Sequence, residues 1–114
     1  MKRTPELFLR DILKASQHIL DFVNDLDYDQ FINDEKTSSA VIRKFEIIGE
    51  AAKNVPDIIK QKYSDVPWKD ISGMRDHLIH AYFGVDNVIV WDTIQSDIPK
   101  IIKSVSQILD DLDQ

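Results

Sequence analysis

The sequence concentrates chemically versatile side chains in one short stretch, residues 73–86. Arg75 and His80 have four residues between them, and Asp76 and Tyr82 belong to the same stretch. An arginine can hold a phosphate with its permanent positive charge, and a histidine titrates near neutral pH. Tyr82 adds a hydroxyl that can be modified. We therefore expect the chemistry of this protein here.

The spacing of these residues suggests how they would cooperate. Residues four apart share one face of a helix, so Asp76 can hold one ring nitrogen of His80 while the other faces a substrate. Arg75 and His80 are five positions apart, about 140° around the helix axis. One helix therefore presents the two side chains poorly to a single ligand. In a dimer, two copies of the motif that face each other would bring an arginine and a histidine to the same ligand.

Such a pair suits attack of an RNA 2′-hydroxyl on the neighbouring phosphate. His80 would remove the hydroxyl proton, and Arg75 would stabilise the charge that grows on the phosphoryl oxygens. This reaction needs neither a metal ion nor a cofactor. The pair alone is also compatible with a surface arginine in an ion pair and a histidine at a helix end, and Tyr82 is also compatible with packing at that end.

The surrounding sequence predicts an all-α, up-and-down helical bundle that forms a single domain over residues 1–114. Apolar residues recur at threes and fours over residues 4–26, 38–54 and 87–112, the pattern of amphipathic helices. We also expect a short helix or turn over 27–36, a helix over 57–63, and a helix from Pro67 to Gly84 that carries the candidate residues. Thr4 and residues 37–39 are candidate caps, and Pro99 should bend the last helix.

Composition narrows the class of protein. The chain has 114 residues, 43% of them hydrophobic, and no cysteine, which excludes disulfides and thiolate sites. It shows no signal-peptide pattern and no apolar run of membrane-spanning length, so we expect a cytoplasmic protein. Its formal net charge of −6 opposes indiscriminate binding to nucleic acid. Any contact with RNA must be local, for example in a groove lined by Arg75, Arg43 and Lys44.

Several other residues are better explained by structure than by chemistry. Trp68 and Trp91 are expected to anchor the core, with base stacking as the alternative. Glu46 and Glu50 resemble a paired-carboxylate metal site, but one pair is too few for the usual helix-bundle site, so solvated or arginine-paired glutamates are favoured. His77 and His18 are assigned structural positions. We predict no metal site.

Four blocks follow one another along this sequence: VIRKFEIIGEAA over residues 41–52, PWKDISGMR over 67–75, HAYFGVD over 80–86, and Val90 with Trp91. Together they resemble the HepT family of HEPN-domain toxins. The likeness covers nearly the whole chain. These blocks are far more specific than the arginine–histidine pair alone.

The resemblance implies an all-α, HEPN-like homodimer whose cleft joins the motifs of both subunits and acts on RNA as a metal-independent endoribonuclease and growth inhibitor. Arg75 and His80 match the active arginine and histidine of the R-x4-H pattern, and Asp76 matches the polar residue after the arginine. The expected partner is a minimal nucleotidyltransferase antitoxin encoded alongside. Tyr82 matches the tyrosine that this partner modifies with AMP.

A different class of function remains open beside the enzyme. The net acidity motivates a non-catalytic binding module, a dimer that serves as substrate and scaffold for the nucleotidyltransferase without cleaving RNA. Incubation of the protein with RNA in EDTA separates the two possibilities.

Overall fold

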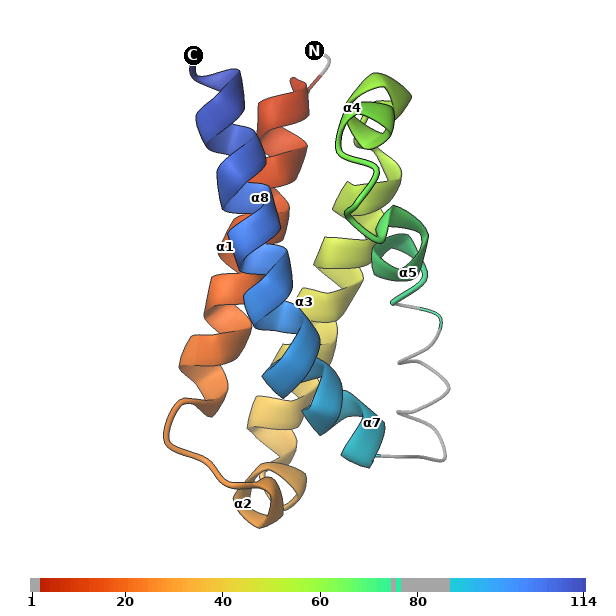
Figure 1. Ribbon diagram of the computed structural model, residues 1–114. Coiled ribbons are helices and arrows are strands. Elements are labelled where there is room, and N and C mark those ends of the chain that lie inside the picture. The colour runs from red at the N-terminus through yellow and green to blue at the C-terminus, as the bar shows by residue number, and fades with distance from the viewer. Residues whose placement is uncertain (1–2, 75, 77–86) are drawn as a thin grey trace.

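The computed structural model describes residues 3–74, 76 and 87–114, and these ranges contain helices and no strand. The all-α prediction is therefore confirmed over them (Figure 1). The elements are α1 (Pro5–Val23), α2 (Tyr28–Ile32), α3 (Glu35–Lys53), α4 (Asp57–Lys62), α5 (Trp68–Ser72), α7 (Asn87–Asp92), the π-helical turn η1 (Thr93–Asp97) and α8 (Ile98–Leu112). No helix within the same ranges is long and apolar enough to cross a membrane.

Three long helices form the body of the molecule. α1 packs against both α3 and α8, and Figure 1 shows α3 and α8 running in the opposite direction to α1. The short helix α2 connects α1 to α3 at one end of the bundle, and α4 follows α3 at the other end, where the two chain termini also lie. This is the up-and-down arrangement that the sequence predicts.

The core lies where the apolar stripes of these helices meet. On α1 the buried residues recur every three or four positions, from Leu9 through Ile12, Ala15 and Ile19 to Val23, so that one side of the helix faces α3 and α8. Burial of such a stripe is the main favourable contribution to folding. Among the described residues, the large side chains with the least exposure are Phe31, Phe45, Leu9, Ile12, Ile19, Ile48, Ile71, Ile94, Ile98, Ile108 and Val41.

The start of α3 differs from its prediction. The helix begins at Glu35, and its cap is Asp34 rather than a residue of the 37–39 segment. One carboxylate oxygen of Asp34 accepts a hydrogen bond from the Thr37 backbone N–H at 3.0 Å, and the other accepts from the Thr37 hydroxyl at 2.7 Å. A carboxylate is a stronger acceptor than a hydroxyl and is also favoured at the positive end of the helix dipole, so the aspartate begins the helix.

The first helix begins as expected and ends early. Pro5 occupies its first turn, but the side chain of Thr4 makes no capping hydrogen bond, and the helix ends at Val23 rather than at residue 26. The early end has a local cause, because Asp27 caps α2. Its side chain accepts from the Gln30 backbone N–H while the Gln30 side chain accepts from the Asp27 N–H. This reciprocal box sets where α2 begins and leaves residues 24–26 as the connection.

The last helical segment is interrupted before the proline that was expected to bend it. A π-helical turn, η1, precedes α8, and Pro99 then lies in the first turn of α8. A proline is tolerated in a first turn because its missing N–H is not needed there. Thr93 supports the turn by donating its hydroxyl to the Ile89 carbonyl at 2.8 Å.

The helix predicted from Pro67 to Gly84 is not continuous. α5 ends at Ser72, and Gly73 forms a turn before Met74 and Asp76, which are again helical. The Gly73 N–H still donates to the Lys69 carbonyl at 2.9 Å. Glycine has a low helix propensity, which explains why the helix is interrupted at this residue. The predicted end of this helix at Gly84 lies outside the described residues.

Candidate functional site

Of the four predicted site residues, the structure describes Asp76. It lies in helical backbone and its side chain is exposed, so its carboxylate is available to a partner. Arg75, His80 and Tyr82 lie outside the described residues. The pairing of Asp76 with His80 and the shared cleft of a dimer therefore stay predictions.

α5 is the element that leads into Arg75, and its position is well defined. Trp68 and Ile71 are buried and hold α5 against α3. The Trp68 indole N–H donates to the carbonyl of Tyr63 at 3.0 Å, which fixes the start of the helix. The prediction that Trp68 anchors the core is confirmed. Met74, the residue directly before Arg75, is also buried.

A groove of about 600 Å³ separates this segment from α8. Its apolar lining comes from Val66, Ile71 and Met74 on one side and from Ile101 on the other. A concave, mostly apolar site with a few polar groups is the usual form of a ligand site. Met74 lines this groove, and Arg75 is the next residue. The R-x4-H motif therefore begins directly after a residue of the groove wall.

The charges along this groove are mixed. Lys100 and Lys103 of α8 line it, but so do Asp65, Asp70 and Asp97. The carboxylates offset the two ammonium groups, so the lining formed by the described residues is not a basic track for a phosphate backbone. This arrangement agrees with an acidic protein in which contacts to RNA are local.

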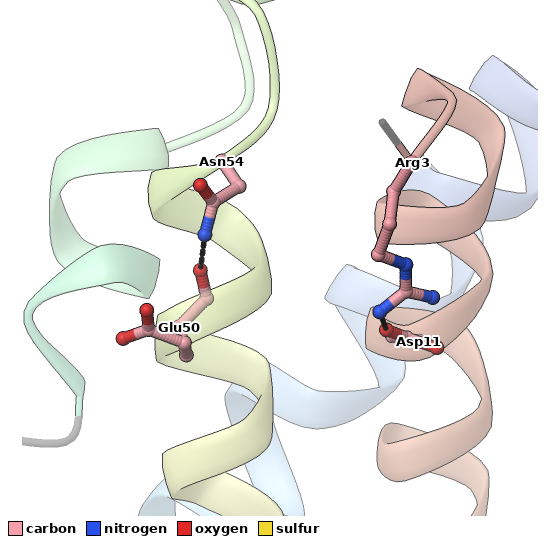
Figure 2. A network of polar contacts seen from close by, with 4 residues as sticks. All are labelled: Arg3, Asp11, Glu50 and Asn54. Atoms are coloured by element: carbon pink, nitrogen blue, oxygen red, sulfur yellow. Dashed lines mark hydrogen bonds and ion pairs between the residues drawn. The ribbon is translucent and has the colours of Figure 1, made fainter. Parts of the chain in front are cut away.

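The residues proposed to line a basic groove with Arg75 do not lie on the α5–α8 groove. Arg43 lines a different, smaller crevice between α1 and α3, of about 180 Å³, together with Arg3 and Asp11. Both arginines there are engaged, since Arg3 pairs with Asp11 at 2.8 Å and Arg43 with Glu46 at 3.3 Å. Figure 2 shows the first pair, with Asp11 on α1 and Arg3 just before that helix. Lys44 is half-buried on α3 and does not line either cavity in the part described.

The two glutamates of α3 differ in their surroundings, since Glu46 is half-buried and Glu50 is exposed. Glu46 is bound to Arg43, as the arginine-paired prediction requires. The carboxylate of Glu50 points away from Arg3 and Asp11 in Figure 2, while the Glu50 carbonyl accepts from the Asn54 side chain at 2.9 Å. Over residues 3–74, 76 and 87–114, no three His, Asp or Glu side chains gather as metal ligands.

Two further residues occupy structural positions. Trp91 is half-buried, and its ring contacts those of Phe31 at 5.2 Å and Tyr28 at 6.2 Å between centroids, which ties α7 to α2. His18 stacks on Phe22 at 6.0 Å on α1, as its structural assignment predicted. Base stacking on either tryptophan has no support in this arrangement.

A polar cluster at the far end of the groove is absent from the sequence predictions. The Tyr63 hydroxyl donates to one carboxylate oxygen of Asp111 at 2.7 Å, and the Gln107 amide donates to the other at 3.0 Å. The hydrogen bond from Tyr63, more than that from Gln107, lowers the pKa of Asp111, and the same bond raises the pKa of Tyr63. Only Gln107 and Asp111 show a local signal, their four-residue spacing, because Tyr63 is 48 positions away.

Comparison with protein families decides where this chain belongs. The family model described as ribonuclease HepT-like matches residues 12–108, which include the whole 75–82 motif. The chain belongs to the HepT-like ribonuclease family. The resemblance found in the four sequence blocks is therefore confirmed.

Relatives within the HepT-like family match almost end to end. Two Methanocaldococcus jannaschii proteins are named as candidate RNases. One is 45% identical over 98% of this chain and 93% of its own length. The other is 47% identical over 99% of this chain and 97% of its own length. A Thermococcus cleftensis protein named “Probable ribonuclease HepT” is 46% identical over 89% of this chain and 92% of its own. No solved structure matches the chain.

Proposed function

We propose that this chain is the toxin of a HepT-type toxin–antitoxin system and a metal-independent endoribonuclease. One observation carries the proposal: the family match runs through the complete R-x4-H-x-Y motif, in a chain whose near full-length relatives are named for RNase activity. The exposed Asp76 and the groove that Met74 helps to line add support, since both leave room for a substrate near this place.

The proposed reaction is transesterification within RNA. His80 accepts the proton of a 2′-hydroxyl, the oxygen attacks the adjacent phosphorus, and the bond from phosphorus to the 5′-oxygen breaks. The products are a 2′,3′-cyclic phosphate and a 5′-hydroxyl, whose proton comes from the protonated histidine of the cleft or from water. Arg75 stabilises the charge on the phosphoryl oxygens, and Asp76 orients His80. The cleft combines the Arg75 and His80 groups of two subunits.

Neutralisation by a nucleotidyltransferase antitoxin completes the proposal. The Tyr82 oxygen attacks the α-phosphorus of a nucleoside triphosphate, pyrophosphate leaves, and the phenolic proton passes to a base or to water. The AMP on Tyr82 brings a negative phosphodiester near Arg75, and it also fills space that an RNA strand must enter. Mass spectrometry after co-expression with the partner should find AMP on Tyr82 and none in Tyr82→Phe.

The decisive test is RNA cleavage in EDTA. Wild-type protein should give products that end in cyclic phosphate, and His80→Ala should lose about 10²- to 10⁴-fold in rate, the usual contribution of general-base catalysis. His77→Ala is the matched control, because it removes an imidazole three residues earlier. Intact RNA at high concentrations of a folded wild-type protein would refute the enzyme and favour the non-catalytic scaffold, a possibility that the net charge of −6 keeps open.

A further inference from the structure

The two walls of the α5–α8 groove are joined at one end by a chain of hydrogen bonds. It runs from the Trp68 indole to the Tyr63 carbonyl at 3.0 Å, then from the Tyr63 hydroxyl to Asp111 at 2.7 Å. Trp68 is the first residue of α5, and Asp111 lies in the last turn of α8. We call Tyr63 and Asp111 the latch.

The latch adjoins the groove through neighbouring residues that line it. Asp65 and Val66, which follow Tyr63, line the groove from one side, and Gln107 lines it from the other. Gln107 also donates to the second carboxylate oxygen of Asp111, so the acceptor is held on both oxygens. Figure 1 places α4, which leads into Tyr63, and the carboxyl end of α8 at the same end of the molecule.

The latch supplies a restraint that packing does not. α5 is held against α3 by its buried side chains, Trp68 and Ile71, whereas a cavity of about 600 Å³ lies between it and α8. The Tyr63 ring packs against the core, and its hydroxyl extends from that fixed ring to α8. A change in this bond would therefore alter the separation of α5 from α8 without removing an apolar side chain from the core.

We infer that Tyr63 and Asp111 are positioning residues that set the placement of α5 and, through Met74, the point from which Arg75 extends. This inference rests on the proposed function for its catalytic consequence. Arg75 follows α5 by three residues, so a shift of α5 is carried along the chain to the guanidinium. A displacement of about 1 Å in a catalytic geometry can cost about 10²-fold in rate.

The test removes the hydroxyl and keeps the ring. Tyr63→Phe should lower kcat for RNA cleavage about tenfold, which corresponds to a partial displacement, and leave KM within about twofold. Asp111→Ala should do the same, and Asp111→Asn, which keeps an acceptor oxygen, should retain most of the activity. Because both substitutions break the same Tyr63–Asp111 bond, Tyr63→Phe combined with Asp111→Ala should be no worse than Asp111→Ala alone.

Two matched controls isolate the latch. Asp110→Ala removes the same charge from the neighbouring, exposed position of α8, and Tyr28→Phe removes a hydroxyl from another half-buried tyrosine. Both should keep wild-type kcat. Each assay is run well below the unfolding temperature of every variant. A loss of activity that tracks the unfolded fraction, an effect on KM alone, or additive losses in the double variant would each overturn the inference.

Amide hydrogen exchange provides a readout that does not depend on catalysis. The N–H groups of Ile71 and Gly73 donate to Pro67 and Lys69 carbonyls within α5. Their exchange should become about tenfold faster in Tyr63→Phe, while core amides of α1 stay unchanged. If the wild-type protein cleaves no RNA, the proposed function fails, and the exchange rates alone decide the latch. Unchanged exchange at Ile71 and Gly73 overturns it in either case.

Discussion

Ser16 is the clearest place to improve the stability of this fold. It lies on α1 among core residues with a side chain that is 0% exposed, and its hydroxyl has no hydrogen-bond partner in the described part of the chain. A buried polar group without a partner costs about 1–3 kcal/mol. Alanine removes that group, and it also has the higher helix propensity, by roughly half a kcal/mol.

Ser16→Ala is therefore expected to raise the free energy of unfolding by about 1–2 kcal/mol, the lower part of the combined range, because loss of the oxygen leaves a small void. For a chain of 114 residues the entropy of unfolding is about 0.24 kcal/mol/K, so the midpoint should rise by about 4–8 °C. Thermal unfolding followed by far-UV circular dichroism measures this shift, and urea titration measures the free energy.

Ser39→Ala supplies the matched control. Ser39 is exposed on α3, so its substitution reports the helix-propensity part alone. The gain at Ser16 should exceed the gain at Ser39 by about 0.5–1.5 kcal/mol. Equal gains would mean that burial of the hydroxyl carries no penalty, and a loss of stability in Ser16→Ala would mean that the hydroxyl is paired in solution. Either result refutes the reasoning.

Three further outcomes follow from the same structure. Phe45→Ala in the core should cost about 3–5 kcal/mol in urea unfolding, whereas Ile58→Ala, at a side chain that is 76% exposed, should change stability by less than about 0.5 kcal/mol. The Thr37 backbone N–H, followed by its hydroxyl, holds the pKa of Asp34 below its ordinary value of 3.8. This carboxylate therefore stabilises the fold above that value, and the contribution is lost as pH falls through the lower folded-state pKa. Asp34→Asn should accordingly lose less stability than wild type between about pH 5 and pH 2 in urea titrations. RNA binding should depend weakly on salt, with a slope of about −1.4 in a log–log plot if two arginines contact phosphates, and a slope steeper than about −4 would contradict a local contact.

The helical class and the main helices could be predicted because apolar periodicity is a local property. The stripe on α1 and that on α8 are visible in the sequence, and both are buried in the structure. Helix ends were harder, because several residues compete to cap. Asp34 begins α3 ahead of the serines and threonine that follow it, and the capping box of Asp27 ends the connection from α1.

Contacts between residues that are far apart in the chain could not be predicted from the sequence. Tyr63 had no reason to be distinguished from other tyrosines until α8 placed Asp111 beside its hydroxyl. The interruption before Pro99 is similar, since a proline predicts a disturbance of the helix but not the π-helical turn that precedes it. At the candidate site, Asp76 is exposed, and the roles of Asp76, Arg75, His80 and Tyr82 stay predictions.

The charge distribution is consistent with a proposed RNA site that consists of few residues. An acidic chain gains little from diffuse attraction to RNA, and two of its arginines, Arg3 and Arg43, are already paired with carboxylates. The lysines of the α5–α8 groove are offset by aspartates in the same lining. We therefore expect affinity and rate to come from the geometry of the proposed small cleft rather than from a basic surface. Under the proposed function, one modification would suffice to silence the protein, because an AMP on Tyr82 would place a negative phosphodiester in that cleft.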